Sequence, residues 1–229
     1  MDSIIATLIN VAAILLGGAI GLTFKSKISK KISVNITRAI GLCVCVIGVS
    51  GALKGDFMLL VVSLALGALC GELINIDGGL NKAGAFLQKK LSKGDGNSNF
   101  GEGFVAAALL FCVGAMSIVG SIESGIRDDK SIILTKSILD GVSAMVLASS
   151  YGLGVLFAAL AVLVYQGSIE FFAGFLQNIL TDELITQISA TGSIMILAIG
   201  FNMTLNAKLK AANLLPGLLF AVGYYYLFI

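Results

Sequence analysis

The chain has 229 residues, 57% of them hydrophobic and 12% charged, and its mean hydropathy is +0.99. Soluble domains carry about 25% charged residues, so this composition excludes a water-soluble fold and favours a protein in contact with membrane lipid. The net charge of +2, without a long basic block, argues against nucleic acid as a partner. The absence of histidine removes the usual serine–histidine and cysteine–histidine catalytic pairs. We therefore expect a membrane protein that is not an enzyme and holds no cofactor.

Apolar segments divide the chain into predicted transmembrane helices. A helix rises about 1.5 Å per residue, so about 20 apolar residues cross the hydrocarbon core. On this scale the sequence predicts an all-α transmembrane bundle of about eight spans: 3–23, 35–53, 57–74, 103–121, 131–149, 152–166, 186–205 and 209–228. The N-terminus lacks the basic start and small-residue cleavage site of a secretory signal, so we expect the first span to be retained. Two stretches, 77–93 and 168–182, favour amphipathic helices on the membrane surface.

The distribution of lysine and arginine predicts the orientation, because cytoplasmic loops carry more of them. With the N-terminus outside, eleven basic residues fall inside: Lys25, Lys27, Lys30, Lys31, Arg38, Lys82, Lys89, Lys90, Lys93, Lys208 and Lys210. Four lie outside or near the outer surface: Lys54, Arg127, Lys130 and Lys136. We therefore expect both termini to lie outside.

A linker rich in glycine, serine and asparagine separates two halves with local similarity. Residues 37–40 (TRAI) match 135–138 (TKSI), and 83–88 (AGAFLQ) resemble 173–177 (AGFLQ). Three spans in each half would make the second half enter the membrane from the opposite side, as in many secondary transporters. The predicted units are a first membrane repeat (1–92), a cytoplasmic linker (93–100), a second, inverted repeat (101–182) and a C-terminal helix pair (183–229).

Asp140 is the strongest candidate for a functional residue. It lies near the middle of the span 131–149, where an unpartnered carboxylate is costly, and Lys136 shares its helical face. The pair predicts a proton- or cation-linked site, or an anchor for a polar solute. The alternatives are a structural ion pair and a break between two half-helices at Asp140–Gly141.

Small and polar residues supply the other candidates. In the span 103–121 they are Gly114, Ser117, Gly120 and Ser121, and they indicate either close helix packing or an unwound, ion-binding stretch. Four more polar side chains lie in or near spans: Asn10, Gln166, Asn202 and Asn213. We interpret Gln166 as an interfacial residue or one at the mouth of a cavity. The expected neighbours of Asp140 are Gly114, Ser117, Ser121, Asn10 and Asn202.

The four cysteines are interpreted as small apolar residues buried in the spans. Cys43, Cys45, Cys70 and Cys112 all lie in apolar stretches, without the paired spacing of a zinc site. We therefore expect no metal centre.

Five stretches together resemble a known family. They are 111–116 (FCVGAM), 118–122 (IVGSI), 136–141 (KSILDG), 165–167 (YQG) and 213–216 (NLLP). They resemble the YqgA/YdfK family of bacterial inner-membrane proteins, over nearly the whole chain. The resemblance implies a multi-pass protein of the bacterial cytoplasmic (inner) membrane, for which transport is one suggested role. It supplies no substrate and no catalytic residue.

These observations favour a secondary transporter of a small polar or charged solute or ion, with a site near the membrane midplane around Asp140. A channel and a non-transporting scaffold or accessory protein are the alternatives. We also expect a homo-oligomer, with small-residue faces such as Gly17 and Gly21 as contacts.

The predicted orientation is tested by labelling single cysteines in intact cells. Cysteines placed at Ser3 and Gly96, in a background without native cysteines, are expected to react from opposite sides of the membrane, because an odd number of spans separates them. Reaction of both positions from the same side would contradict the predicted spans.

Overall fold

The computed structural model describes residues 4–25, 30–79, 82, 100–177 and 179–228, and this part of the chain contains helices and no strand. The helices are α1 (Ile5–Lys25), α2 (Lys30–Ala52), α3 (Phe57–Ile74), α5 (Phe100–Cys112), α6 (Ala115–Arg127), α7 (Ser131–Tyr151), α8 (Gly154–Phe171), α9 (Ala173–Leu176), α10 (Asp182–Leu205), η2 (Ala211–Leu214) and α11 (Pro216–Phe228). The all-α prediction is confirmed for these residues.

Six stretches of the described chain are long and apolar enough to cross a membrane: Ile5–Phe24, Phe57–Ile74, Ser131–Tyr151, Gly154–Phe171, Asp182–Leu205 and Ala211–Phe228. The bent pair α5 and α6 makes a seventh if it counts as one span. The apolar part of α2, Thr37–Ala52, is shorter than this criterion requires. Each of the eight predicted segments therefore contains a helix, and six or seven of them have the length and composition of a span.

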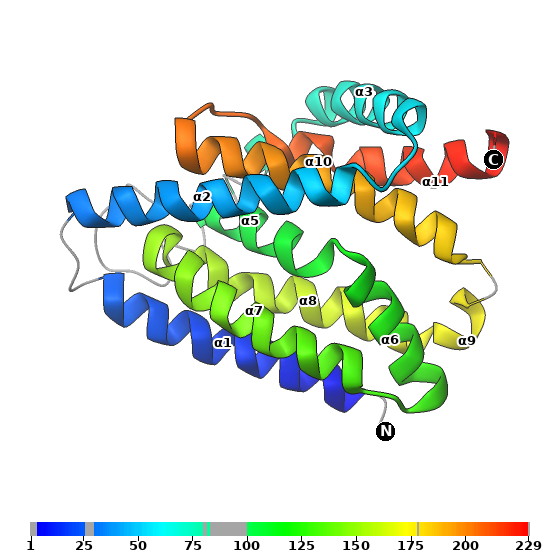
Figure 1. Cartoon of the computed structure of the whole chain (residues 1–229), viewed down its shortest axis with the longest axis horizontal. Helices are drawn as coiled ribbons and strands as arrows, with labels where there is room; N and C mark the ends of the chain where they lie inside the picture. Colours follow the sequence, from blue (N-terminus) through cyan, green and yellow to red (C-terminus); the bar gives the residue numbers. More distant parts are fainter. Residues whose placement is uncertain (1–3, 26–29, 80–81, 83–99, 178, 229) are drawn as a thin grey trace.

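The long helices run along one common direction, and successive ones alternate in direction (Figure 1). Helices α1, α7 and α8 form one layer, and α2, α10, α3 and α11 form another. Helices α5 and α6 lie between the layers and contact α7, α8 and α10. Both termini lie at the same end of the bundle, together with the turn between α6 and α7 (Figure 1).

Helices α1 and α7 approach so closely that their contact requires glycine. A Cβ atom at Gly17 would collide with the backbone of Gly141, and one at Gly21 with the backbone of Met145. Small residues allow helix backbones to approach in this way in lipid. Both glycines contact another helix of the same molecule, so the expectation that Gly17 and Gly21 form an oligomer interface is wrong.

The region 168–182 differs from the predicted surface helix. Helix α8 continues to Phe171, the four-residue helix α9 follows, and α10 begins at Asp182. Gln166 and Glu170 of α8 bond to α1 instead of facing the membrane surface, and the helix extends beyond the predicted end at residue 166. Most of the other predicted surface helix, 77–93, and the linker 93–99 lie outside the described residues. Phe100 is the buried first residue of α5.

The close contact of α1 with α7 predicts a specific sensitivity at Gly21. Gly21→Ala is expected to lower the melting temperature of the purified protein, because overpacking costs about 1–3 kcal/mol. Gly223→Ala in α11 is the matched control, since no atom outside its own helix backbone lies within 4 Å of the added Cβ. Its melting temperature should not fall. Equal destabilisation of the two variants would contradict the role of Gly21 in packing.

Candidate functional site

A buried ion pair lies within the bundle on α7. The Lys136 ammonium donates to Asp140 Oδ2, and each residue is 6% exposed. Asp140 is nine residues from the start of α7, or about 13.5 Å along the helix, which is near the middle of a hydrocarbon core of about 30 Å. Helix α7 is continuous through Asp140 and Gly141, so the alternative of a helix break at this position is wrong.

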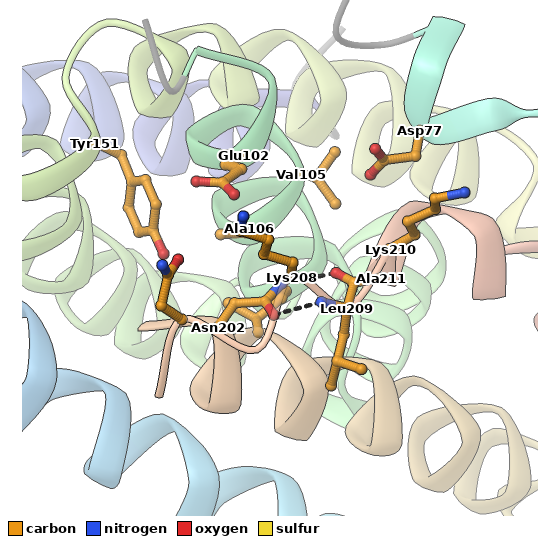
Figure 2. A pocket seen from close by; sticks show the side chains of 12 residues that line it. Asp77, Glu102, Val105, Ala106, Tyr151, Asn202, Lys208, Leu209, Lys210 and Ala211 are labelled. Carbon is orange, nitrogen blue, oxygen red and sulfur yellow. Dashed lines mark hydrogen bonds between the residues drawn. The ribbon is translucent and has the colours of Figure 1, made fainter. Parts of the chain in front are cut away.

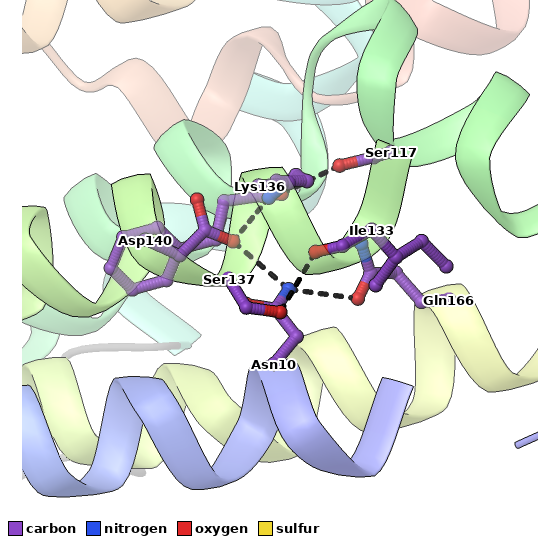
Figure 3. Close-up of polar contacts among 8 residues, drawn as sticks. Asn10, Ser117, Ile133, Lys136, Ser137, Asp140 and Gln166 are labelled. Carbon is purple, nitrogen blue, oxygen red and sulfur yellow. Dashed lines mark hydrogen bonds and ion pairs between the residues drawn. The ribbon is translucent and has the colours of Figure 1, made fainter. Parts of the chain in front are cut away.

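Asn10 connects the ion pair to two neighbouring helices. Its Nδ2 atom donates to Asp140 Oδ2 and to Gln166 Oε1, at 3.0 Å in each case (Figure 3). Asn10 on α1 and Gln166 on α8 are both fully buried. Gln166 therefore lies in the interior, and the interpretation of this residue as interfacial or at a cavity mouth is wrong. The network joins α1, α7 and α8.

A second pair between α1 and α8 was not predicted from the sequence. Thr7 Oγ1 donates to Glu170 Oε2 at 2.6 Å, and both residues are buried. Thr7 and Asn10 are three residues apart on α1, while Gln166 and Glu170 are four apart on α8. These spacings place each pair on one helical face. This spacing is the signal in the sequence that indicates the pair, but the predicted surface helix over 168–182 places Glu170 outside the spans.

We call the residues that make these bonds the polar layer: Thr7, Asn10, Lys136, Asp140, Gln166 and Glu170. The layer holds one ammonium group and two carboxyl groups. Lys136 pairs with Asp140, whereas Glu170 takes part in none of the four ion pairs formed within the described residues. Ionised carboxylates would therefore outnumber cations in this buried region.

Several polar atoms in and beside the layer have no partner among the described residues. They are Asn10 Oδ1, Gln166 Nε2, Glu170 Oε1 and Ser121 Oγ, all buried. Ser121 lies on α6 between Gly120, which packs against Ile133 of α7, and Gly125, which packs against Glu170. A buried polar atom without a partner costs about 1–3 kcal/mol. The layer therefore offers acceptors and a donor to a polar ligand.

The helix beside the layer is broken at Gly114. Its φ of 149° and ψ of 146° separate α5 from α6, and the two helices are bent by 56°. The Ser117 hydroxyl donates to Phe111 O at 2.8 Å, so it satisfies one carbonyl that the break releases. Gly120, in contrast, packs directly against α7. Two interpretations of this segment follow from its sequence, an unwound stretch and close helix packing. The helix is interrupted at Gly114, whereas Gly120 serves close packing.

An apolar cavity of about 350 Å³ opens beside this break. Gly114, Cys112 and Tyr165 are among its lining residues, together with apolar side chains of α10 and α11. Val105 of α5 lines this cavity and also the polar cavity described next. The two cavities therefore adjoin each other along α5.

The polar cavity has a volume of about 360 Å³ (Figure 2). Its polar lining includes Asp77, Glu102, Tyr151, Asn202, Asn206, Lys208 and Lys210. Asn202 donates to Leu209 O and accepts from Leu209 N, at 2.7 Å in both bonds. The expectation that Asn202 is a neighbour of Asp140 is therefore wrong. The chain after α10 folds back, and both the oxygen and the nitrogen of the Asn202 amide bond to the backbone of Leu209.

Asn213 lies in a third environment, at the start of the C-terminal helices. Its Oδ1 accepts from the backbone N–H of Asp77 at 2.8 Å, and its Nδ2 donates to Glu72. Lys210 also pairs with Glu72. Pro216 is the first residue of α11, where its missing N–H has no consequence. These contacts fasten the η2–α11 segment to α3.

Within the described residues no group of three or more His, Cys, Asp or Glu side chains could hold a metal ion.

Sequence comparisons relate the chain to other proteins over nearly its whole length. It matches the family described as "Protein of unknown function (DUF554)" over residues 5–226. The "Uncharacterized membrane protein YdfK" of Bacillus subtilis (strain 168) is 36% identical over 218 residues, covering 93% of this chain and 92% of the relative. The "Uncharacterized protein YqgA" of Escherichia coli (strain K12) is 30% identical over 223 residues, covering 96% and 95%. No solved structure matches the chain significantly. The resemblance inferred from the sequence is confirmed.

The ion pair predicts a dependence of stability on both partners. Lys136→Met is expected to lower the melting temperature strongly, because removing one partner of a buried pair costs about 3–5 kcal/mol. Adding Asp140→Asn should recover part of the loss, since no unpaired charge then remains. Thermal unfolding of the purified variants measures both effects. A double variant no more stable than Lys136→Met alone would contradict the coupling.

Proposed function

We propose that this integral membrane protein, which belongs to the family of proteins of unknown function DUF554, is a secondary transporter of a small polar or charged solute or ion. The proposal depends on one observation, the buried polar layer around Asp140 and Lys136. Ionisable groups at membrane depth are expensive, and they commonly mark substrate or ion pathways. A fully satisfied pair would serve packing alone, whereas this layer also contains polar atoms without partners.

The helix break at Gly114 supports this proposal. Transporter sites are commonly formed where a membrane helix is discontinuous, because the released backbone groups contact the ligand. Here the broken α5–α6 pair contacts α7 and α8, which carry most of the polar layer. The polar layer and the break would together form the solute site.

The two adjoining cavities suggest a path toward that site. The polar cavity lies between the start of α5 and the turn after α10, and the apolar cavity extends from Val105 to Gly114. We place the polar cavity on the cytoplasmic side, because Lys208 and Lys210 line it. The polar cavity would be the entrance for a solute, and the apolar cavity would separate this entrance from the break.

The proposed topology has eight spans, with α2 and the bent pair each crossing the bacterial cytoplasmic membrane once. Both termini would then lie outside, and their position at one end of the bundle agrees with this arrangement (Figure 1). The proposed inverted repeat relates 1–92 to 101–182. If this repeat is present, α1, α2 and α3 superimpose in that order on the α5–α6 pair, α7 and α8 after inversion.

Transport is tested by solute flux into proteoliposomes, after a thermal-shift screen of amino acids, carboxylates and ions has selected the solute. Asp140→Asn retains the shape of the side chain and removes its charge, so we expect a less stable but folded variant whose flux falls to the level of empty vesicles. Asp128→Asn is the control, because this carboxylate is exposed in the turn before α7. Its flux should match that of the unaltered protein.

Two outcomes would contradict the proposal. A folded Asp140→Asn variant with unchanged flux would remove the role of the polar layer. Absence of flux for every solute that stabilises the protein would favour a scaffold or accessory role. A channel would be distinguished by flux that does not saturate with solute concentration.

A further inference from the structure

Glu170 is the charged group of the polar layer that the Asp140–Lys136 pair leaves uncompensated. It is 3% exposed, and its Oε2 accepts only from the neutral hydroxyl of Thr7 among the described residues. Its Oε1 has no partner there. An isolated ionised carboxylate in an apolar environment is strongly unfavourable. A positive charge from outside the described side chains, either a metal cation or a proton, would neutralise Glu170.

The geometry around Glu170 supplies oxygen atoms on two neighbouring levels. The Asn10–Gln166 bond forms one level between α1 and α8, and the Thr7–Glu170 bond forms the next. One helical turn, about 5.4 Å, separates such levels. Hard cations bind oxygen at about 2.3–2.6 Å, which is close to half of this separation.

We propose that Glu170, Asn10 and Thr7 form a binding site for a monovalent metal cation of the sodium class. The ligands are Glu170 Oε1, Asn10 Oδ1 and the lone pairs of Thr7 Oγ1. The first two are buried acceptors without a partner in the described residues. Carboxylate, amide and hydroxyl oxygens suit a hard cation and exclude soft metals.

The charge of the site favours a monovalent ion. A single carboxylate neutralises one positive charge, and the carboxylate of Asp140 is already paired with Lys136. A divalent ion at Glu170 would leave one excess positive charge buried, which is again costly. Gln166 Nε2, the unpartnered donor next to the site, is free to bind the transported solute.

The site lies close to one end of the two helices that form it. Thr7 is two residues from the start of α1, and Glu170 is one residue from the end of α8. These helix ends lie at the end of the bundle that holds both termini (Figure 1). This assignment deepens the proposed transport function, since a cation at Glu170 would be the coupling ion for a solute bound nearer Asp140.

The site is tested by thermal unfolding of the purified full-length protein, without solute, in chloride salts of sodium, potassium or choline at equal ionic strength and pH. Sodium is expected to raise the melting temperature saturably above the value in choline, by preferential binding to the folded state. Glu170→Gln should abolish this increment. Glu123→Gln, which removes a carboxylate from the surface pair with Arg127, should retain it.

Thr7 provides a second pair of variants, should Glu170→Gln fail to fold. Thr7→Ser keeps the hydroxyl and should keep the sodium dependence. Thr7→Val keeps the shape but loses a ligand oxygen, so the half-saturating sodium concentration should rise about tenfold or more. Identical half-saturation in Thr7→Ser and Thr7→Val would overturn the proposed ligand set.

Other results would overturn the site itself. One is equal stabilisation by all three salts, and another is a sodium-dependent rise in melting temperature that persists in Glu170→Gln. A third is a melting temperature that responds to pH but not to sodium, which would mean that a proton neutralises Glu170. The outcome is separable from that of the flux assay. A sodium increment without any solute flux would contradict transport alone, and Asp140-dependent flux without a sodium increment would overturn the cation site alone.

Discussion

The pairing of Lys136 with Asp140 is the interaction on which the interior of this protein depends. Two charges at membrane depth are tolerated only when they neutralise each other and their remaining polar atoms are bonded. Asn10 supplies one such bond and in turn binds Gln166, so α1 and α8 are fixed relative to α7. The close contact of α1 with α7 through Gly17 and Gly21 makes this geometry possible, because it brings Asn10 within reach of Asp140.

Rigid and interrupted segments occupy different places in the bundle. The glycine contacts of α1 with α7 bring two backbones together and leave no room for side chains between them. Gly114 acts in the opposite way, because its backbone conformation ends α5 and redirects the chain. The polar layer lies beside both features. The proposed solute site would lie between this closely packed pair of helices and the interrupted one.

Part of this site could be predicted from the sequence, because its signal is local. Lys136 and Asp140 are four residues apart within an apolar stretch, so their shared face and their burial both follow from helical periodicity. Asn10, Ser117 and Ser121 are likewise visible in the sequence as polar residues within apolar segments. The bundle class followed from the lengths of the apolar segments.

The remaining features depend on contacts between distant segments. Polar residues after Val164 resemble the end of a span, and only the bond from Thr7 shows that Glu170 is buried. Asn206 and Lys208 adopt positive φ values of 53° and 55°, which turn the chain back onto Asn202 and remove it from the Asp140 region. Gly114 and Gly141 look alike in sequence, yet one breaks a helix and the other packs beside Ala13 of α1.

The proposed function requires that solvent and solute can reach the polar layer, which a sealed structural ion pair would not allow. The most direct test is the reactivity of Ser121→Cys, in a background without other cysteines, toward a small charged thiol reagent in membrane vesicles. Ser121 is fully buried and its hydroxyl has no described partner, so cysteine replaces it with little change in shape. Val164→Cys is the control, because this residue is exposed on the outer surface of α8, where lipid suppresses the reactive thiolate. We expect Ser121→Cys to react and Val164→Cys not to react. A folded Ser121→Cys protein that stays unreactive from both sides of the membrane would show that the polar layer is sealed.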